Sequence, residues 1–266
     1  MYIYGECMNK HINTNICTII CISILLATNA YATSTLVYDG GGPQSQVQAA
    51  MGLLGITYDL RNPGNPVTAA DLASHDVLVV GWNYLGDMSG LSASVLAAGI
   101  TGNILLTGHD ADVHTAQGFD WTGNPGDPVG VAANAFMSQA ISFAATGGGA
   151  GLVALGDMTT AFSYLPTEWG ITATGDLLEE TVTSFTTDGL ASGVFDGLTP
   201  ASMSNWWHSY HAEFNSFSAN FTPFEFGGTT GQDLVTIARV IPAPGAILLS
   251  GLGAGLFTWL RRRKVF

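Results

Sequence analysis

Two short apolar runs, each closed by glycine and polar residues, constrain the fold more than any other feature of the chain. They read "HDVLVVGWN" at residues 75–83 and "GNILLTGHD" at residues 102–110. An unbroken aliphatic run of this length indicates a strand that is buried on both faces, as in a parallel sheet covered by helices. Similar runs at residues 34–40 and 151–155 predict two further strands.

Helix-like segments separate these strands. Residues 44–54 repeat apolar side chains at helical spacing, Thr68 opens a second helix, and further helices are expected at residues 91–98 and 131–145. This alternation predicts an α/β domain with a mainly parallel sheet and helices on both faces. A β-sandwich is the competing architecture, and the helical segments count against it. Stretches rich in Thr and Phe favour strands that extend or close the sheet, at residues 180–188, 221–228 and 233–239.

The first 32 residues are typical of a secretory signal peptide. Lys10 precedes an apolar run at residues 16–27, and Ala30-Tyr31-Ala32 supplies a small-x-small cleavage site. We therefore expect export by the Sec machinery and removal of residues 1–32 by signal peptidase. The only cysteines lie before this cut, at positions 7, 17 and 21. The mature chain would then contain no disulfide, thiolate nucleophile or Cys-ligated zinc.

Residues 33–240 form the expected folded body and are strongly acidic. They hold 19 of the 20 Asp and Glu residues of the chain but only Arg61 and Arg239 as basic residues, which gives a formal charge of −17 with neutral His. A field of this sign repels nucleic acid and anionic lipid. We therefore expect no nucleic-acid partner.

The C-terminal stretch, residues 241–264, has the pattern of a membrane segment. Fifteen uncharged residues, 246–260, are followed by three arginines and a lysine. As a helix they would span about 22 Å, and residues 241–245 could add apolar length toward a hydrocarbon core of about 30 Å. The basic cluster predicts a transmembrane helix whose last residues stay in the cytoplasm. The alternative, a terminal core helix with a basic tail, does not explain why the positive charge is confined to one end.

This stretch resembles the PEP-CTERM protein-sorting domain. The resemblance rests on "PAPG", a glycine-rich apolar helix and an arginine cluster; its signal residues are Pro242, Pro244, Gly245, Arg261, Arg262 and Arg263. Ala243 stands where the name-giving Glu usually lies. The resemblance implies export across the inner membrane of a Gram-negative type of bacterium, transient membrane anchoring, and processing by an exosortase. The destination would be the cell surface or the extracellular matrix.

Three predicted strands end in polar residues, and parallel strands bring such ends to one edge of a sheet. The ends are Asp39 with the glycines after it, Gly81-Trp82-Asn83, and Gly108-His109-Asp110. They predict a ligand cleft at that edge, although glycine and polar residues also make ordinary turns. The candidate ligand-binding residues are Asp39, Gly40, Gly41, Trp82, Asn83 and, from a later aromatic segment, Trp207.

The densest polar cluster is "TGHDADVH", residues 107–114. Asp110, Asp112 and His114 combine carboxylate and imidazole groups that suit a divalent metal such as zinc, manganese or calcium. The stretch matches neither an EF-hand loop nor a His-Glu-x-x-His helix. A solvated polar loop is the alternative reading.

A second cluster, "NWWHSYHAEF", covers residues 205–214. His208 and His211 would share a face on a helix and point to opposite sides on a strand. Its aromatic residues could simply pack in the core. The functional alternatives are an active-site histidine supported by Glu213 and an aromatic platform for a sugar or another planar apolar face.

The body also resembles a class I glutamine amidotransferase-like domain, in which a flavodoxin-like sheet places a nucleophile at a sharp turn and a His-x-Glu motif comes later. The "ILLTGHD" element and "SYHAEF" carry this resemblance. Position by position, His109 stands at the nucleophile's turn, and His211 with Glu213 matches the His-x-Glu. Because histidine replaces the required cysteine, glutaminase chemistry through a thioester is excluded.

Three functional hypotheses follow. The first is an exported surface or matrix protein that binds a ligand without catalysis. The second is a hydrolase of a glycan or amide that uses His109, Asp110, His211 and Glu213 as acid-base or metal-bound groups. The third is a calcium-stabilised structural or adhesive module, which the acidic body suggests.

Overall fold

The computed structural model describes residues 33–82, 84–119, 123–156, 162–175 and 177–241. These residues belong to one compact unit. Its strands are β1 (Thr35–Tyr38), β2 (Tyr58–Arg61), β3 (Val77–Val80), β4 (Ile104–Thr107), β5 (Gly151–Ala154), β6 (Thr172–Thr174), β7 (Val182–Phe185), β8 (Glu213–Ser216), β9 (Thr222–Gly227) and β10 (Asp233–Arg239). Its helices are α2 (Val47–Leu53), α3 (Ala69–Ser74), α4 (Ala93–Gly99), α5 (Ala111–Gln117), α6 (Pro128–Ala145) and α7 (Thr187–Ala191), with a 3₁₀ turn η1 (Thr167–Trp169).

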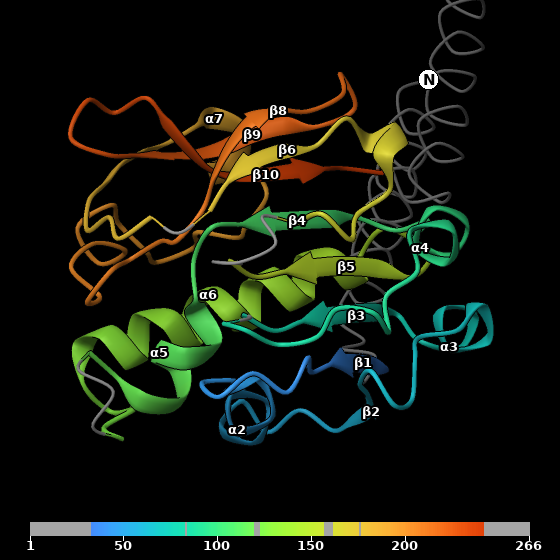
Figure 1. The fold of residues 1–266 in the computed structure, drawn as a ribbon. Coiled ribbons are helices and arrows are strands. Elements are labelled where there is room, and N and C mark those ends of the chain that lie inside the picture. The colour runs from blue at the N-terminus through green and yellow to red at the C-terminus, as the bar shows by residue number, and fades with distance from the viewer. Residues whose placement is uncertain (1–32, 83, 120–122, 157–161, 176, 242–266) are drawn as a thin grey trace, which may run out of the picture. The chain divides into compact units, whose positions relative to one another are not determined.

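A large mixed sheet forms the centre of the unit (Figure 1). Its strand order is β2-β1-β3-β5-β4-β10-β9-β7, and a separate two-stranded sheet pairs β6 with β8. The five strands from β2 to β4 pair in parallel, while β10, β9 and β7 extend the sheet in antiparallel pairing. Strands β1, β3, β4 and β5 are buried along their whole length. The expected α/β class with a large, mainly parallel sheet is confirmed.

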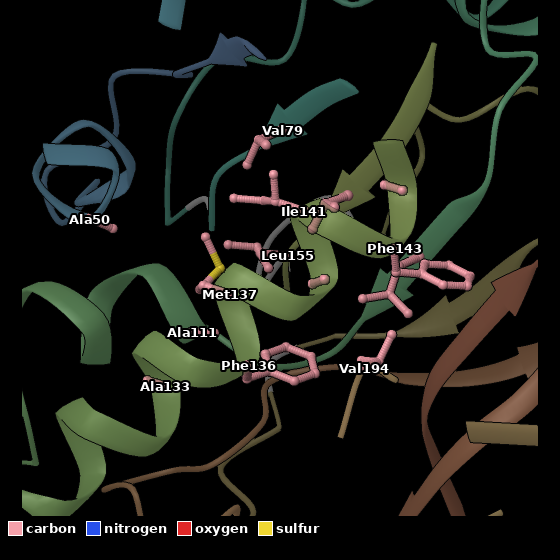
Figure 2. Packing of buried hydrophobic residues seen from close by; sticks show 14 of the residues in the cluster. Ala50, Val79, Ala111, Ala133, Phe136, Met137, Ile141, Phe143, Leu155 and Val194 are labelled. Carbon is pink, nitrogen blue, oxygen red and sulfur yellow. The ribbon is translucent and has the colours of Figure 1, made fainter. Parts of the chain in front are cut away.

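Helices cover both faces of this sheet. Alternate strand residues such as Val79 and Val153 point to one face and pack with α2 and α6, as Figure 2 shows for Val79, Met137 and Ile141. Their neighbours Leu78 and Leu152 point to the other face and pack with the side chains of α3 and α4. The continuous apolar runs follow from this arrangement, because each strand needs apolar residues on both sides.

Local signals set the starts of two helices. Thr68 and Asp71 form a reciprocal capping box at the start of α3, as the sequence predicts. Helix α6 begins with Asp127, whose side chain accepts from the Gly130 N–H at 2.7 Å, followed by Pro128 at the first helical position. The chain therefore enters both helices through a side chain that satisfies a free backbone donor.

One expectation is corrected by the fold. The stretch at residues 107–114 is not a solvated loop, because its second half starts α5, a helix packed against α2 and α6. Its polar side chains are buried, and Asp110 pairs with His114 within the stretch.

The sorting signal lies almost entirely outside the described residues. Within the described ranges, no helix has the length and apolar character needed to cross a membrane. The signal peptide, residues 1–32, also lies outside them.

Candidate functional site

A sharp turn at Gly108 brings two distant segments together at the carboxyl end of β4. A side chain at Gly108 would collide with the carbonyl oxygen of Ala212, so the close approach requires glycine. The backbone N–H of His211 donates to the Gly108 carbonyl at 2.8 Å. His211 is therefore anchored beside the residues that follow β4.

Asp110 lies between two imidazole rings. Its Oδ2 is 3.2 Å from Nε2 of His211, and its Oδ1 is 3.4 Å from Nε2 of His114. At the other ring nitrogen, Nδ1 of His211 donates to the Leu177 carbonyl at 2.9 Å. Nδ1 of His114 donates to the Gly118 carbonyl, also at 2.9 Å. Each imidazole is thus fixed at Nδ1 and presents Nε2 to the same carboxylate; we call Asp110, His114 and His211 the Asp110 network.

Charge pairing inside the Asp110 network outweighs the cost of burial. Burial is the largest influence on the Asp110 carboxyl and would raise its pKa, but His114 and His211 together hold that pKa well below its usual range. Burial likewise opposes protonation of His114, yet the Asp110 carboxylate raises the pKa of this imidazole. The network therefore favours a buried carboxylate beside a protonated His114.

The carboxyl group of Asp112 has a raised pKa, in contrast to that of Asp110. Burial and the nearby Asp110 charge raise its pKa to about 7. Its Oδ2 accepts from the Trp82 backbone N–H at 3.1 Å, while its Oδ1 has no hydrogen-bond partner among the described residues. Below about pH 7, Asp112 therefore holds a proton next to the ionised Asp110.

A second buried network surrounds His109. Its Nδ1 donates to the Ser209 carbonyl, and its Nε2 lies 2.9 Å from Oε2 of Glu225. That carboxylate oxygen also accepts from the Thr236 hydroxyl at 2.6 Å, and Thr236 contacts the Thr107 hydroxyl at 2.9 Å. Burial works against protonation of His109, but Glu225 raises its pKa overall. We call these residues the Glu225 network; it joins the turn after β4 to β9 and β10.

Sequence reasoning did not identify Glu225. It lies in "FTPFEFGG", where a carboxylate occupies an inward-facing position of an otherwise apolar strand. A fully buried Glu without a partner is too costly to occur. A Glu inside an otherwise apolar strand is the sequence feature that could have predicted a buried partner such as His109.

Glu213 does not support His211 in the way that the His-x-Glu motif suggests. It stands at the start of β8, paired with Thr174 of β6, and is half-buried. Burial raises the pKa of its carboxyl group. The carboxylate in contact with His211 is Asp110 instead.

The predicted glycine-rich strand end forms a self-contained turn. Asp39 Oδ1 accepts from the Gly41 N–H at 2.8 Å and from the Ser45 hydroxyl at 2.7 Å, and its Oδ2 accepts from the Gln48 amide at 2.6 Å. Gly41 has a φ of 70°, which glycine adopts readily. Gly40 packs closely against the backbone of Asp87. Asp39, Gly40 and Gly41 therefore determine the conformation of the turn between β1 and α2.

Two further candidates lie at the end of β3. Trp82 is buried, stacks on Tyr84 with ring centroids 6.1 Å apart, and lies 5.5 Å from the His211 ring. It therefore forms part of the wall around the Asp110 network. Asn83 lies outside the described residues.

Trp207 is the exposed aromatic residue among the predicted ligand-binding residues that the structure describes. The residue is 51% exposed, and its ring packs edge-to-face with that of Phe119, with centroids 6.0 Å apart and an interplanar angle of 79°. Phe119, itself 40% exposed, follows α5. Asn205, Trp207 and His208 all have φ near +60 to +71°, a region that non-glycine residues rarely adopt. The two aromatic residues form an exposed surface that we call the Trp207 surface.

The geometry also bears on the predicted metal site at Asp110, Asp112 and His114. Within the described ranges, no group of three or more His, Cys, Asp or Glu residues is arranged to hold a metal ion. The two oxygens of Asp110 are directed to different histidines, His114 and His211, which fits this result.

Two recesses on the described part of the chain lie away from both networks. One, of about 560 Å³, lies near His75 and Gly149 at the opposite edge of the sheet. Another, of about 520 Å³, is lined by Asn103 and Phe224. Neither includes a residue of the Asp110 or Glu225 network.

The fold and site thus define an α/β protein with two buried histidine–carboxylate networks and an exposed aromatic pair. Comparison with known protein families and with characterised proteins finds no match.

Proposed function

We propose that this chain is an exported protein of the cell surface or extracellular matrix that binds a ligand without catalysing a reaction. The N-terminal signal pattern and the PEP-CTERM-like C-terminus support export, transient anchoring through a transmembrane helix, and exosortase processing. The body would be a flavodoxin-like, amidotransferase-like domain without the nucleophile. The histidine at the turn after β4 supports that relationship. The order β2-β1-β3-β5-β4 shares its first three strands with the flavodoxin-like order 2-1-3-4-5 but interchanges the last two.

One observation carries the non-enzymatic part of the proposal. Three of the four side chains that a hydrolase would use, His109, Asp110 and His211, are buried to at least 98%. His109 contacts Glu225 and the Ser209 carbonyl, while Asp110 lies between His114 and His211. The fourth, Glu213, is half-buried. A general acid or base must reach the proton that it transfers, either directly or through one water. Burial of this depth favours a structural role.

That structural role is specific. The Asp110 network connects α5, through His114, to the segment that contains Trp207, through His211. His114 also holds the Gly118 carbonyl, one residue before Phe119. The buried charges therefore hold together the two segments that carry the exposed aromatic residues.

Hydrolysis of a glycan or amide is the second candidate, and two observations favour it. Asp110 and His211 lie within contact of each other at the carboxyl end of the sheet, where α/β enzymes place their sites. The pKa of Asp112, raised to about 7, suits a general acid or base near neutral pH. This reading requires an opening that admits substrate to buried groups.

The two functions are separated by measuring binding and turnover on the same material. We expect the full chain, purified in detergent, to retain matrix polysaccharide on a column and to release no new reducing ends or free amines. Turnover that disappears in Asp110→Asn, while binding persists, would replace the binding function with the hydrolytic one.

The sorting proposal has its own test. Mass spectrometry of the protein recovered from the cell exterior should give an N-terminus at Thr33 and a C-terminus near the Pro-x-Pro at residues 242–244. Recovery of an intact C-terminus at Phe266 would contradict processing.

A further inference from the structure

From the geometry of the Trp207 surface we infer a binding site for the pyranose rings of an uncharged polysaccharide. The inference rests on the proposed ligand-binding function and assigns it a place and a ligand class. The first observation is exposure: Trp207 is 51% exposed, while the adjacent Trp206 is fully buried. This exposure makes the Trp207 ring available to a ligand, and aromatic side chains are enriched at binding surfaces.

The backbone on each side of Trp207 is firmly held. On one side, the Asn205 N–H donates to the Glu180 carbonyl at 2.8 Å, and the Trp206 indole N–H donates to the Ser202 carbonyl at 2.7 Å. On the other, the His208 N–H donates to Oε1 of Glu180 at 2.8 Å. Three residues here keep a costly left-handed conformation, which persists only where surrounding contacts impose it.

Phe119 is held with similar precision. Its backbone N–H donates to Oδ2 of Asp127, the residue that also caps α6, at 2.7 Å. Phe119 thus presents an edge to Trp207 from a second fixed segment. Two rigid aromatic side chains lose little conformational entropy on binding, so the surface is preorganised.

Polar groups at the rim suit hydroxyl groups. Glu180, whose side chain is 41% exposed, lies 3.3 Å from Nδ1 of His208, which is itself 31% exposed. A carboxylate accepts hydroxyl hydrogens, and an imidazole can donate or accept. An apolar ring face beside such groups matches a pyranose, which presents C–H groups on its faces and hydroxyls at its edges.

Shape and charge narrow the ligand class. Trp207 and Phe119 are 51% and 40% exposed, so they offer an open surface along which a polymer can add weak contacts. The body carries −17 between residues 33 and 240, so uronate or sulfated polymers would be repelled. An uncharged polysaccharide fits both conditions.

The test is affinity electrophoresis of the full chain in gels that contain a neutral glucan or a polyuronate. We expect the glucan to retard the original chain. Trp207→Ala should raise the dissociation constant at least about tenfold, which corresponds to ~1.4 kcal/mol of binding free energy. Trp207→Phe should recover part of the lost affinity. Leu190→Ala, which removes a comparably exposed side chain on α7, is the control and should bind as the original chain does. Thermal melts should show that each variant is folded.

Each other outcome has a definite meaning. Undiminished glucan binding by a folded Trp207→Ala variant would overturn this inference and leave the proposed function intact. Stronger retardation by the polyuronate would overturn the ligand class. Failure of the original chain to bind any polysaccharide or matrix extract would overturn both the inference and the proposed function.

Discussion

Nε2 of His211 lies 3.2 Å from Oδ2 of Asp110, although 101 positions separate the two residues. This contact exists because Gly108 allows the chain at Ala212 to pass against the turn after β4. It joins the first half of the unit, where strands pair in parallel, to the later segment that precedes β8. A histidine and a carboxylate that resemble catalytic groups in the sequence thus form a buried cross-link in the fold.

Replacing Asp110 by Asn should therefore be strongly destabilising. The substitution leaves His114 and His211 buried without their shared negative partner, and breaking a buried ion pair costs about 3–5 kcal/mol. Urea unfolding at pH 6 would measure the loss. Asp59→Asn is the matched control, because Asp59 pairs with His75 through a side chain that is 66% exposed, and exposed pairs contribute about 0–1 kcal/mol. Equal effects of the two variants would refute the role of the network.

Asp112 should make stability fall as pH rises from about 4 to 7. Its folded pKa, about 7, lies above the unfolded value of 3.8, so the folded state binds more protons in this window. Because the folded state binds more protons than the unfolded state in this window, the free energy of unfolding falls as pH rises. Asp112→Asn removes this penalty, and we expect the variant to gain a few kcal/mol over the original chain between pH 4 and pH 8, since one pKa unit is about 1.4 kcal/mol.

The measurement for Asp112 is urea unfolding of both chains at several pH values. Asp196→Asn, which replaces an exposed carboxyl group, provides the control for the change from Asp to Asn. A difference between the original chain and Asp112→Asn that does not change with pH would show that Asp112 is ionised in the folded protein.

The sequence specifies the central sheet well, because burial on both faces leaves a strong imprint. Strands β1, β3, β4 and β5 need apolar residues at every position, so each reads as a continuous run. The Thr68 capping box is similarly local, since all of its atoms lie within four residues. Such features are predictable because a short stretch of sequence contains the whole interaction.

The site was less predictable because its interactions are long-range. Helix α5 spans only Ala111–Gln117 and is rich in polar residues, so its pattern resembles a solvated loop. The partner of His211 depends on how the turn at Gly108 meets Ala212, which no local pattern encodes. The cluster of Asp110, Asp112 and His114 was visible in the sequence, but its burial became apparent only from packing against α2 and α6.

Glu225 should contribute to stability through the hydrogen bonds that its carboxylate accepts as well as through its charge. Glu225→Ala removes the acceptor for both His109 and the Thr236 hydroxyl, and a loss of about 3–5 kcal/mol is expected for breaking a buried pair. Glu225→Gln keeps an amide oxygen for Thr236 and should cost less. Guanidinium unfolding compares the two. The exposed Glu168→Ala serves as control, and a Gln variant no more stable than the Ala variant would contradict this account.

Gly108→Ala should be the most damaging single-methyl change in the chain's described core. The new Cβ would collide with the Ala212 carbonyl oxygen, a backbone atom that cannot move without displacing His211 from Asp110. We expect the free energy of unfolding to fall by more than about 4 kcal/mol, a loss typical of substitutions that disrupt core packing.

Gly52→Ala is the control. It adds the same methyl group within α2, where nothing lies within 4 Å, and should stabilise the protein by about 0.5–1 kcal/mol. Urea unfolding of both variants therefore isolates the close approach at Gly108 from the general effect of replacing glycine. A Gly108→Ala chain as stable as the original would mean that β4 and the His211 segment do not meet as described.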